Sequence, residues 1–462
     1  MVFIEGESSS SNRHRRLVVR GTDRLSTLPQ HILIEILSHL STIDAARVSF
    51  SSKFWMTTWR LHPNLVFDYS QFPAMVNKAH SFLRFVDWTI AHHHESDVKI
   101  FELQLGPTTY CEVSIKYQWV EFAIQHNVQK LVLHGRVCGT QNLVDSIFSC
   151  RSLVKLELSV DELVFSWPET IQLPNLKKLK LKFLLLPEMI TNQDLFSNFP
   201  ALEKLSMFFC NFAFFNVLSI SSSRLMEFMM SACPGMESCS IRLQTPFLSK
   251  FIYTSWDPRE SVLQVPPCAF SLVVNGDDSC MYRGSPNELS QTIVKLSREL
   301  FGTSYITTGH WLIQYLSLVP NLPRQLAFVT YNYLLMLNVN LWPVARHVKT
   351  LMLLVSKCPK LSVLSINFVT PQGRIVNRGN WGYEANNDGV GDFGDLNNVT
   401  IENFGGNGTE MTLVRHLLAR TPHLHIMRIE MNPLLDDVDA DLKIHQILEY
   451  WRAAPRANII FD

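Results

Sequence analysis

LVKLEL at residues 153–158 and LKKLKL at residues 176–181 are two copies of one pattern, in which leucine stands at the first, fourth and sixth positions. The last two leucines alternate with a charged residue, which predicts a short strand with one buried face. The first leucine would pack the preceding turn against that strand. Because such a unit cannot bury its apolar face alone, the pattern predicts a stack of similar units.

The same pattern continues on both sides of these two copies. Between residues 100 and 253 it begins at Ile100, Val128, Leu153, Leu176, Leu202, Leu225 and Leu248, so consecutive copies start 23 to 28 residues apart. This period and this apolar core are typical of leucine-rich repeats. Segments such as Trp119–Ile124 would form the helical or irregular return on the convex side. The sequence therefore predicts an α/β fold with a leucine-rich-repeat solenoid as its body.

A second group of copies follows a stretch in which the pattern is hard to follow. Between about residues 255 and 330 we expect a loop at Asn275–Asp278 and an amphipathic helix at Glu288–Phe301. The pattern then returns, with copies that begin at Leu334, Leu361, Leu396 and Leu424. The longest interval between them contains Gly373–Asp395, which is rich in glycine and asparagine and predicts an exposed loop.

Residues 23–68 form a different, helical module in front of the repeats. Pro29 stands where a first helical turn begins, a position that tolerates proline because its N–H has no partner within the helix. Apolar residues then recur at helical spacing and form one stripe: Ile32, Leu33, Ile36, Leu37 and Leu40. A second helix begins near Asp44, and a third is expected from Lys53 to Leu61, with Trp55 and Trp59 on one face.

This module has more apolar surface than its length can bury. Burial of one isoleucine or leucine stabilises a fold by roughly 1.5–3 kcal/mol, so five on one stripe represent about 7–15 kcal/mol. Three short helices cannot cover both that stripe and two tryptophans. Either the repeats cover the remainder and the module only caps the solenoid, or a partner protein covers it. The residues alone leave both alternatives open.

Composition and charge narrow the class of protein. Hydrophobic residues make up 47% of the 462 residues, which excludes a largely disordered chain, and the formal net charge is zero. That balance predicts no nucleic-acid and no membrane partner. The nine cysteines include no CxxC pair and lie in apolar segments, which favours reduced core cysteines in an intracellular protein, cytoplasmic and/or nuclear. We expect a disordered tail at residues 1–22 and neither a signal peptide nor a membrane helix.

Few residue patterns in the chain indicate chemistry. His92, His93 and His94 are adjacent, but side chains on one loop point in different directions and no ligand cluster with suitable spacing surrounds them. The glycines of Gly389–Gly394 form a GxGxxG, yet a strand rather than a helix is expected after them, unlike a nucleotide site. No GxSxG, HExxH or Walker motif occurs. We therefore predict no enzyme activity, no catalytic residue, no metal and no cofactor.

The leading module resembles an F-box of the plant type. Its opening is matched by Asp23–Ser26, Leu28, Pro29, Ile32, Leu33 and Ile36–Leu40, its middle by Asp44–Arg47, and its end by Ser51–Trp55, Trp59 and Pro63–Leu65. Two positions depart from that family. His31 stands where an acidic residue is common, and Phe54 stands where arginine is usual. Neither departure removes the apolar stripe.

The rest of the chain is similar to plant F-box proteins with leucine-rich repeats, and its end resembles their FBD module. The segments that carry this resemblance are Trp119–Leu131, Ser149–Leu156, Leu173–Lys177, Val399–Gly406, Leu413–Leu418, Met427–Ile429 and Pro455–Phe461. The implied organisation is a tail at 1–22, an F-box at 23–68, a helical connector at 69–99, repeats at 100–357 and an FBD-like module at 358–462 that continues the solenoid.

The resemblance implies a substrate-receptor subunit of a cullin-based ubiquitin ligase. The F-box would dock on a Skp-type adaptor, which links to the cullin, and the repeats would hold an unknown target protein. The residues expected to contact the adaptor are Leu28, Pro29, Ile32, Leu33, Ile36, Leu37, Leu40, Val48 and Trp55. Trp59 would instead pack against the first repeat. The alternative is a non-ligase scaffold whose N-terminal helices only cap the solenoid.

Overall fold

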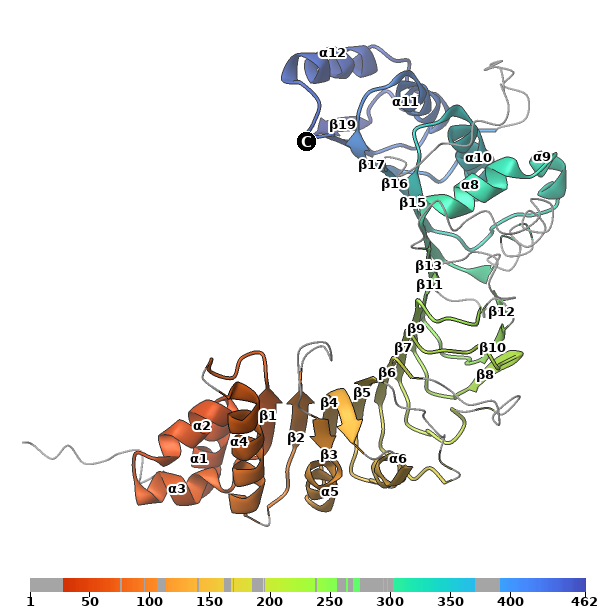
Figure 1. Ribbon diagram of the computed structural model, residues 1–462. Coiled ribbons are helices and arrows are strands. Elements are labelled where there is room, and N and C mark those ends of the chain that lie inside the picture. Colours follow the sequence, from red (N-terminus) through yellow and green to blue (C-terminus); the bar gives the residue numbers. More distant parts are fainter. Residues whose placement is uncertain are drawn as a thin grey trace, which may run out of the picture.

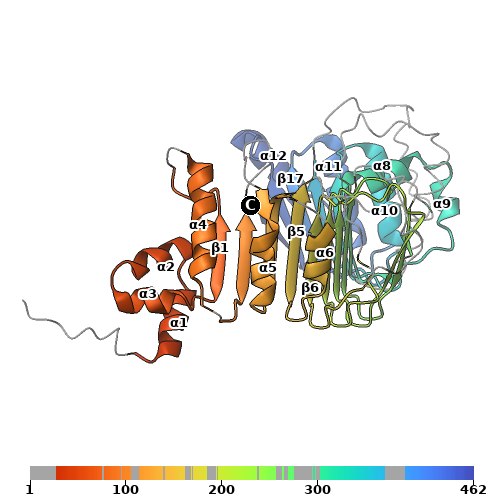
Figure 2. The ribbon, with the colours of Figure 1, turned by 60° about the horizontal axis from the view of Figure 1, so that its bottom comes forward.

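The computed structural model describes residues 28–462 apart from 75–76, 95, 106–113, 139–140, 162–167, 169, 185–193, 195, 237–238, 256–262, 265–268, 275–293, 295–296, 298–301 and 370–390. The chain forms a wide arc (Figure 1), with strands along its inner side and helices such as α5, α6, α8 and α10 on its outer side. The first three helices lie at one end of the arc and project beyond the sheet (Figure 2).

One parallel sheet runs along the whole arc. Among the described residues it has sixteen strands, in the order β1-β2-β4-β5-β6-β7-β9-β11-β13-β14-β15-β16-β17-β18-β19, with β3 paired to β4. The strands are β1 Asn64–Asp68, β2 Ile100–Gln104, β3 Ser114–Lys116, β4 Lys130–Cys138, β5 Lys155–Asp161, β6 Lys178–Lys182, β7 Lys204–Phe208, β9 Glu227–Ser231, β11 Lys250–Ser255, β13 Ala269–Val274, β14 Tyr305–Thr308, β15 Met336–Leu341, β16 Val363–Phe368, β17 Asn398–Phe404, β18 Ile426–Met431 and β19 Asn458–Phe461. The leucine-rich-repeat fold class is confirmed.

The leucine pattern determines the register of the strands. In β6 the residues Leu179 and Leu181 are buried while the three lysines between and beside them are not. Leu179 lies opposite Leu156 of β5 on one side and Leu205 of β7 on the other. Equivalent leucines therefore form continuous buried rows across the sheet. The strand positions predicted for the copies that begin at Val128 to Leu248 and from Leu334 onward are confirmed. The first copy begins at Val98 and not at the predicted Ile100, because Phe101 and Leu103 of β2 lie opposite Leu131 and Leu133 of β4.

Helices connect successive strands on the outer side. They are α4 Lys78–His92, α5 Tyr117–Gln125, α6 Gln141–Phe148, α8 His310–Leu318, α9 Leu322–Gln325, α10 Ala345–Ser356, α11 Gly408–Arg420 and α12 Asp437–Leu448. Helix α5 contains the segment predicted as a convex return. Helix α4 lies within the predicted connector at 69–99, and Asn77 at its N-cap has a left-handed backbone with φ of 59°. It also extends to His92, which was predicted to lie in a loop.

Three features of the β-structure were not predicted from the sequence pattern. Strand β1 pairs with β2 and begins the sheet within the segment that resembles the F-box. Strands β13 and β14 continue the sheet through the stretch that was hard to follow. A separate three-stranded sheet is formed by β8 Val217–Ser221, β10 Ser240–Gln244 and β12 Leu263–Gln264 on the outer side (Figure 1).

Several predicted segments fall outside the described residues. They are the loop at 275–278, nearly all of the helix at 288–301 and most of the glycine-rich loop at 373–395. Gly391 and Gly394 of the GxGxxG are described and lie before strand β17, so a strand follows them as expected. Strands β15 to β19 continue the same parallel sheet to the C-terminus.

The described cysteines agree with the expectation of reduced core thiols. Cys150, Cys210, Cys233, Cys239 and Cys358 are buried, and none of these five forms a disulfide bond. Burial raises the pKa of the Cys358 thiol to about 12, so the neutral thiol is the stable form. These side chains behave as small apolar groups of the core.

Candidate protein-binding site

The helical module at the N-terminal end consists of three short helices, α1 Gln30–Ser38, α2 Thr42–Ser49 and α3 Lys53–Trp59. The Ser41 hydroxyl caps α2 by accepting the backbone N–H of Asp44 at 3.1 Å, and the Ser52 hydroxyl caps α3 by accepting that of Trp55 at 3.2 Å. These caps satisfy N–H groups that would otherwise lack partners at helix starts. The serines thus mark the starts of α2 and α3, and α3 begins at the predicted Lys53 but ends at Trp59, two residues before the predicted Leu61.

Buried apolar contacts fix this module to the repeats. Leu37, Ala45, Ala46 and Trp59 form a small core, and Trp59 is only 2% exposed. The indole of Trp59 stacks on Trp88 of α4, with ring centroids 4.9 Å apart. Trp59 therefore packs within the chain, but it contacts helix α4 of the connector and not the first repeat, where it was predicted to pack.

Hydrogen bonds join the same module to the first strand of the sheet. The backbone N–H of Val66 donates to the hydroxyl of Thr42 at 2.7 Å, and the side-chain amide of Asn64 donates to the carbonyl of Ser38 at 2.9 Å. Both contacts bridge from β1 to the ends of helices α1 and α2. The module is thus held in one orientation relative to the solenoid.

Helix α1 divides the predicted apolar stripe between two environments. Leu33 and Leu37 point inward and are 2% and 0% exposed. Ile32 and Ile36, one turn apart, are 39% and 38% exposed, and Pro29 before them is exposed as well. An isoleucine pair facing solvent on a helix that is already anchored by its other face is available for a partner.

The other predicted contact residues lie at intermediate depth. Leu28, Leu40, Val48 and Trp55 are half-buried, and Leu40 and Trp55 pack against the small core of the module. Of the nine residues predicted to touch an adaptor, the structure therefore exposes Pro29, Ile32 and Ile36, partly covers these four, and encloses Leu33 and Leu37.

Two exposed apolar side chains of the module were not predicted from the sequence. Phe50 follows α2 and is 78% exposed, although its ring stacks at 6.4 Å on Trp88. Met56 on α3 is also exposed. Both sit outside the helical stripe on which the prediction was based. Of the two departures from the family pattern, His31 is exposed, and Phe54 meets Trp55 edge-to-face at 5.7 Å.

Charged pairs on this module are exposed. Arg47 and Asp44 are 2.9 Å apart on α2, and His39 lies 3.5 Å from Glu35 on α1. All four side chains are more than half exposed, so each pair contributes little to stability. The exposed surface of the module therefore carries both apolar side chains and charged pairs.

The histidines at the junction with the repeats serve a structural purpose. His93 bonds through its Nε2 to the backbone carbonyl of His62 at 3.0 Å, and His92 bonds through its Nδ1 to the carbonyl of Trp88 at 2.8 Å. Burial lowers the pKa of His62 to about 4, with a smaller contribution from His93. Within the described residues, no group of His, Cys, Asp or Glu side chains is placed to hold a metal ion.

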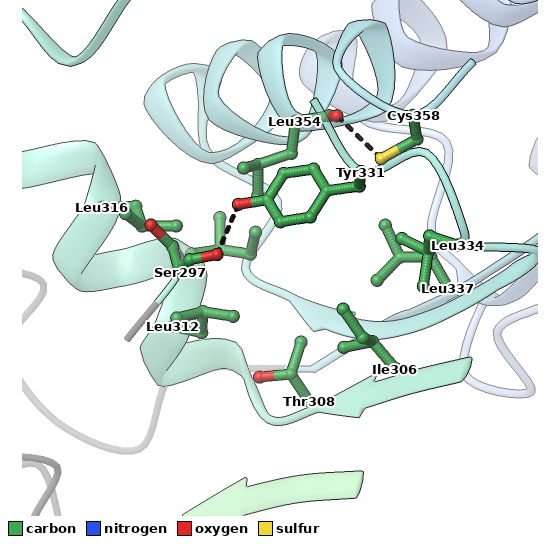
Figure 3. Close-up of a pocket in the computed structure, with 11 residues that line it drawn as sticks. Ser297, Ile306, Thr308, Leu312, Leu316, Tyr331, Leu334, Leu337, Leu354 and Cys358 are labelled. Carbon is green, nitrogen blue, oxygen red and sulfur yellow. Dashed lines mark hydrogen bonds between the residues drawn. The ribbon is translucent and has the colours of Figure 1, made fainter. Parts of the chain in front are cut away.

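A small cavity lies between α8, β14, β15 and α10 (Figure 3). Its volume is about 30 Å³ and its lining is mostly apolar. Tyr331 donates its hydroxyl to the carbonyl of Ser297 at 2.9 Å, and Cys358 donates its thiol to the carbonyl of Leu354 at 3.1 Å. A space of this size holds about one water molecule, so this cavity is a packing gap rather than a ligand site.

Comparison with known proteins identifies the two parts of the chain. Residues 25–67 match the F-box domain, and residues 117–265 match the repeats described as "FBD-associated F-box protein At5g56370, LRR repeats". Among the helices that the structure describes, none is long and apolar enough to cross a membrane.

Similar curated proteins come from Arabidopsis thaliana. F-box/FBD/LRR-repeat protein At1g51370 is 32% identical over 204 residues, which cover 44% of each chain. Putative F-box/LRR-repeat protein At3g42770 is 35% identical over a match that covers 34% of this chain and 31% of the relative. F-box/LRR-repeat protein At3g59210 is 29% identical over a match that covers 50% of this chain and 49% of the relative. Each match thus spans less than half of the relative's length. The chain carries an F-box domain followed by the leucine-rich-repeat region of FBD-associated F-box proteins.

Proposed function

We propose that this protein is the substrate-receptor subunit of an SCF-type ubiquitin ligase. Its F-box would bind a Skp-type adaptor and through it a cullin, while the repeats hold a target protein. The observation that carries this proposal is the exposed pair Ile32 and Ile36 on a helix whose opposite face is fixed in the core. F-box proteins act inside the cell, so we place the complex in the cytoplasm, the nucleus or both.

The adaptor would cover the outer face of α1 and the adjoining helices. Pro29, Ile32 and Ile36 supply the exposed apolar contacts, and the half-buried Leu28, Leu40, Val48 and Trp55 border them. Leu33 and Leu37 act indirectly in this proposal, because both are buried and Leu37 packs α1 against Ala45 and Trp59. A preformed apolar face of this kind binds with little ordering cost.

The chain itself would carry out no chemical step. It would hold the target near a ubiquitin-charged conjugating enzyme bound elsewhere on the complex. Tethering of this kind raises the effective concentration of the target's lysines around the reactive thioester. The rigid attachment of the F-box through Trp59, Thr42 and Asn64 keeps that distance defined.

The second candidate is a scaffold whose N-terminal helices only cap the solenoid. The packing of Trp59 on Trp88 favours it, since the module does close one end of the apolar core. That contact uses the inner side of the module, however. A scaffold role does not explain why Ile32 and Ile36 face solvent.

Adaptor binding separates the two candidates. The full chain is expressed together with each of several plant Skp-type adaptors, and complex formation is measured by size-exclusion chromatography. Deletion of residues 23–68 is a poor control because it also removes β1 and uncovers the edge of β2. The double variant Ile32→Asp, Ile36→Asp leaves the sheet intact. Co-elution that this variant abolishes supports the receptor, and a folded chain that binds no adaptor favours the scaffold.

A further inference from the structure

Six lysines gather on the inner side of the arc, where β4 to β7 lie side by side (Figure 1). This lysine patch consists of Lys130, Lys155, Lys178, Lys180, Lys182 and Lys204. The strand register places four of them in one row, because Lys130 pairs with Lys155, Lys155 with Lys178, and Lys178 with Lys204. Lys180 and Lys182 continue from Lys178 along the same face of β6, since Leu179 and Leu181 between them are buried.

Carboxylates within the sheet balance only part of this charge. Lys130 contacts Glu102 and Lys204 contacts Glu227, each at 2.5 Å. Glu157 lies 2.8 Å from Lys180, 3.8 Å from Lys182 and 3.9 Å from Lys155. Six cations therefore face three anions. Among the described residues Lys178 has no acidic partner, and it is exposed at the centre of the patch.

Folding does not account for this arrangement. Like charges that face one another on paired strands destabilise a sheet. Crowding is visible at Lys182, where burial and then the charge of Lys180 lower the pKa of the ammonium group. Glu157 stays ionised because its hydrogen bond with His134 and its contact with Lys180 lower its pKa to about 2, against the effect of burial. An anionic ligand would relieve the crowding.

Aromatic side chains border the lysine patch at the carboxyl ends of β6 and β7. Phe183 and Phe209 follow these strands, are 46% and 44% exposed, and stack with ring centroids 5.0 Å apart. Their φ angles are 57° and 54°, a left-handed backbone that is unusual for a bulky residue. Lys180 and Lys182 lie 5.8 and 5.9 Å from the ring of Phe208. A ligand for the patch would thus meet apolar surface beside positive charge.

We propose that the lysine patch and the pair Phe183 and Phe209 bind an extended, acidic peptide segment that also carries an apolar side chain. This inference rests on the proposed role in target capture and names the chemical class of the target's recognition segment. The row of four lysines spans three strand spacings, about 14 Å, which about four residues of extended chain can follow. Carboxylates of the peptide would pair with lysines, and its apolar side chain would lie on the stacked rings.

Other anionic macromolecules fit this surface less well. A flat membrane cannot follow the inner side of an arc. A nucleic-acid backbone would bring its phosphates against Glu102, Glu157 and Glu227, which lie within the patch. A peptide can avoid that repulsion, because neutral residues can lie between its acidic ones. We therefore expect a peptide rather than a nucleic acid.

The test selects peptides from a random twelve-residue phage library on the full-length chain. Enriched sequences should carry net negative charge and an aromatic or aliphatic residue, unlike the input library. Synthetic copies labelled with a fluorophore then give dissociation constants by anisotropy, each beside a copy with phosphoserine in place of its carboxylates. The triple variant Lys178→Gln, Lys180→Gln, Lys182→Gln should bind the peptides about tenfold more weakly, because several charge contacts are lost together.

Two further variants show whether a loss of peptide binding comes from the proposed site, from a general loss of positive charge or from misfolding. The variant Lys99→Gln, Lys360→Gln, Arg456→Gln removes the same charge at exposed positions elsewhere and should bind like the unaltered chain. The variant Phe183→Asn, Phe209→Asn removes both rings at positions whose left-handed backbone asparagine adopts readily, so it should fold normally and bind weakly.

Three results would overturn the proposal: enrichment without acidic bias, equal loss of binding in both triple variants, or displacement of the peptides by a twelve-nucleotide RNA at lower concentration. Peptide binding requires no adaptor. If the chain binds the adaptor but no acidic peptide, only this inference is wrong. If it binds acidic peptides but no adaptor, only the proposed ligase role is wrong.

Discussion

At the residue scale, two neighbouring side chains of α1 have opposite environments and different roles. Leu37 is fully buried against Ala45 and Trp59, whereas Ile36 beside it is 38% exposed. The helical spacing of the apolar residues was readable from the sequence, but their division between core and surface was not. It depends on where Trp59 and Ala45 meet α1, which only the packing of three helices determines.

This division can be measured with two alanine variants. Leu37→Ala should lower the free energy of unfolding of the helical module by about 2–5 kcal/mol, since a buried leucine leaves a cavity. Ile36→Ala should change it by less than about 1 kcal/mol, because that side chain is already largely hydrated. Urea unfolding followed by tryptophan fluorescence gives the two values, since Trp55 and Trp59 of the module are among the ten tryptophans of the chain. Equal effects of the two variants would contradict the division.

Buried histidines should make stability depend on pH. Burial lowers the pKa of His347 from 6.5 to about 3 and that of His62 to about 4. The unfolded chain therefore binds more protons below pH 6.5, so the folded state has its full stability above that pH and loses it as the pH falls toward 4. At pH 5 each histidine should cost about 2 kcal/mol.

The measurement is urea unfolding at pH 7.5 and pH 5. His347→Gln removes one titrating group and should reduce the loss by about 2 kcal/mol. His31→Gln, at an exposed position, is the matched control. An unchanged loss of stability in His347→Gln would show that this imidazole is already protonated in the folded chain.

At the element scale, the strands that repeat the full apolar pattern were predictable, whereas β14 and β1 were not. Strand β14 has the sequence Tyr305–Thr308, in which Ile306 and Thr308 point inward, so a threonine replaces the second apolar residue. Strand β1 was overlooked for another reason. Its residues Asn64–Asp68 directly follow the helical module, and their pairing with β2 depends on a connection of about thirty residues through α4.

Helix α11 offers a test of local stabilisation. Asn407 accepts the backbone N–H groups of Thr409 and Glu410, and the carboxylate of Glu410 accepts the N–H of Asn407 in return. Asn407→Ala should destabilise the C-terminal part by about 1 kcal/mol, and Asn407→Ser should cost little because serine also caps. Unfolding midpoints in urea would show this order. A serine variant as unstable as the alanine variant would contradict the cap.

At the scale of the whole molecule, one continuous parallel sheet joins the F-box end to the C-terminus. No edge interrupts it among the described strands, so β16 to β19 belong to the same sheet as the strands before them. The sequence could predict this because the leucine pattern recurs after residue 334. The resulting arc places the F-box at one end and the lysine patch close to it along the sheet (Figure 1). A target bound there would lie near the adaptor.

The most direct test of the central claim is the affinity of the full chain for a plant Skp-type adaptor. It is measured by calorimetry for the unaltered protein, Ile36→Asp and Leu434→Asp. Leu434 is 92% exposed and precedes α12, which lies at the far end of the arc (Figure 1), so it is the matched control. The receptor role predicts weakening by a factor of about one hundred or more for Ile36→Asp, since a charge would be buried at the contact, and no change for Leu434→Asp. Equal affinity of all three proteins would contradict it.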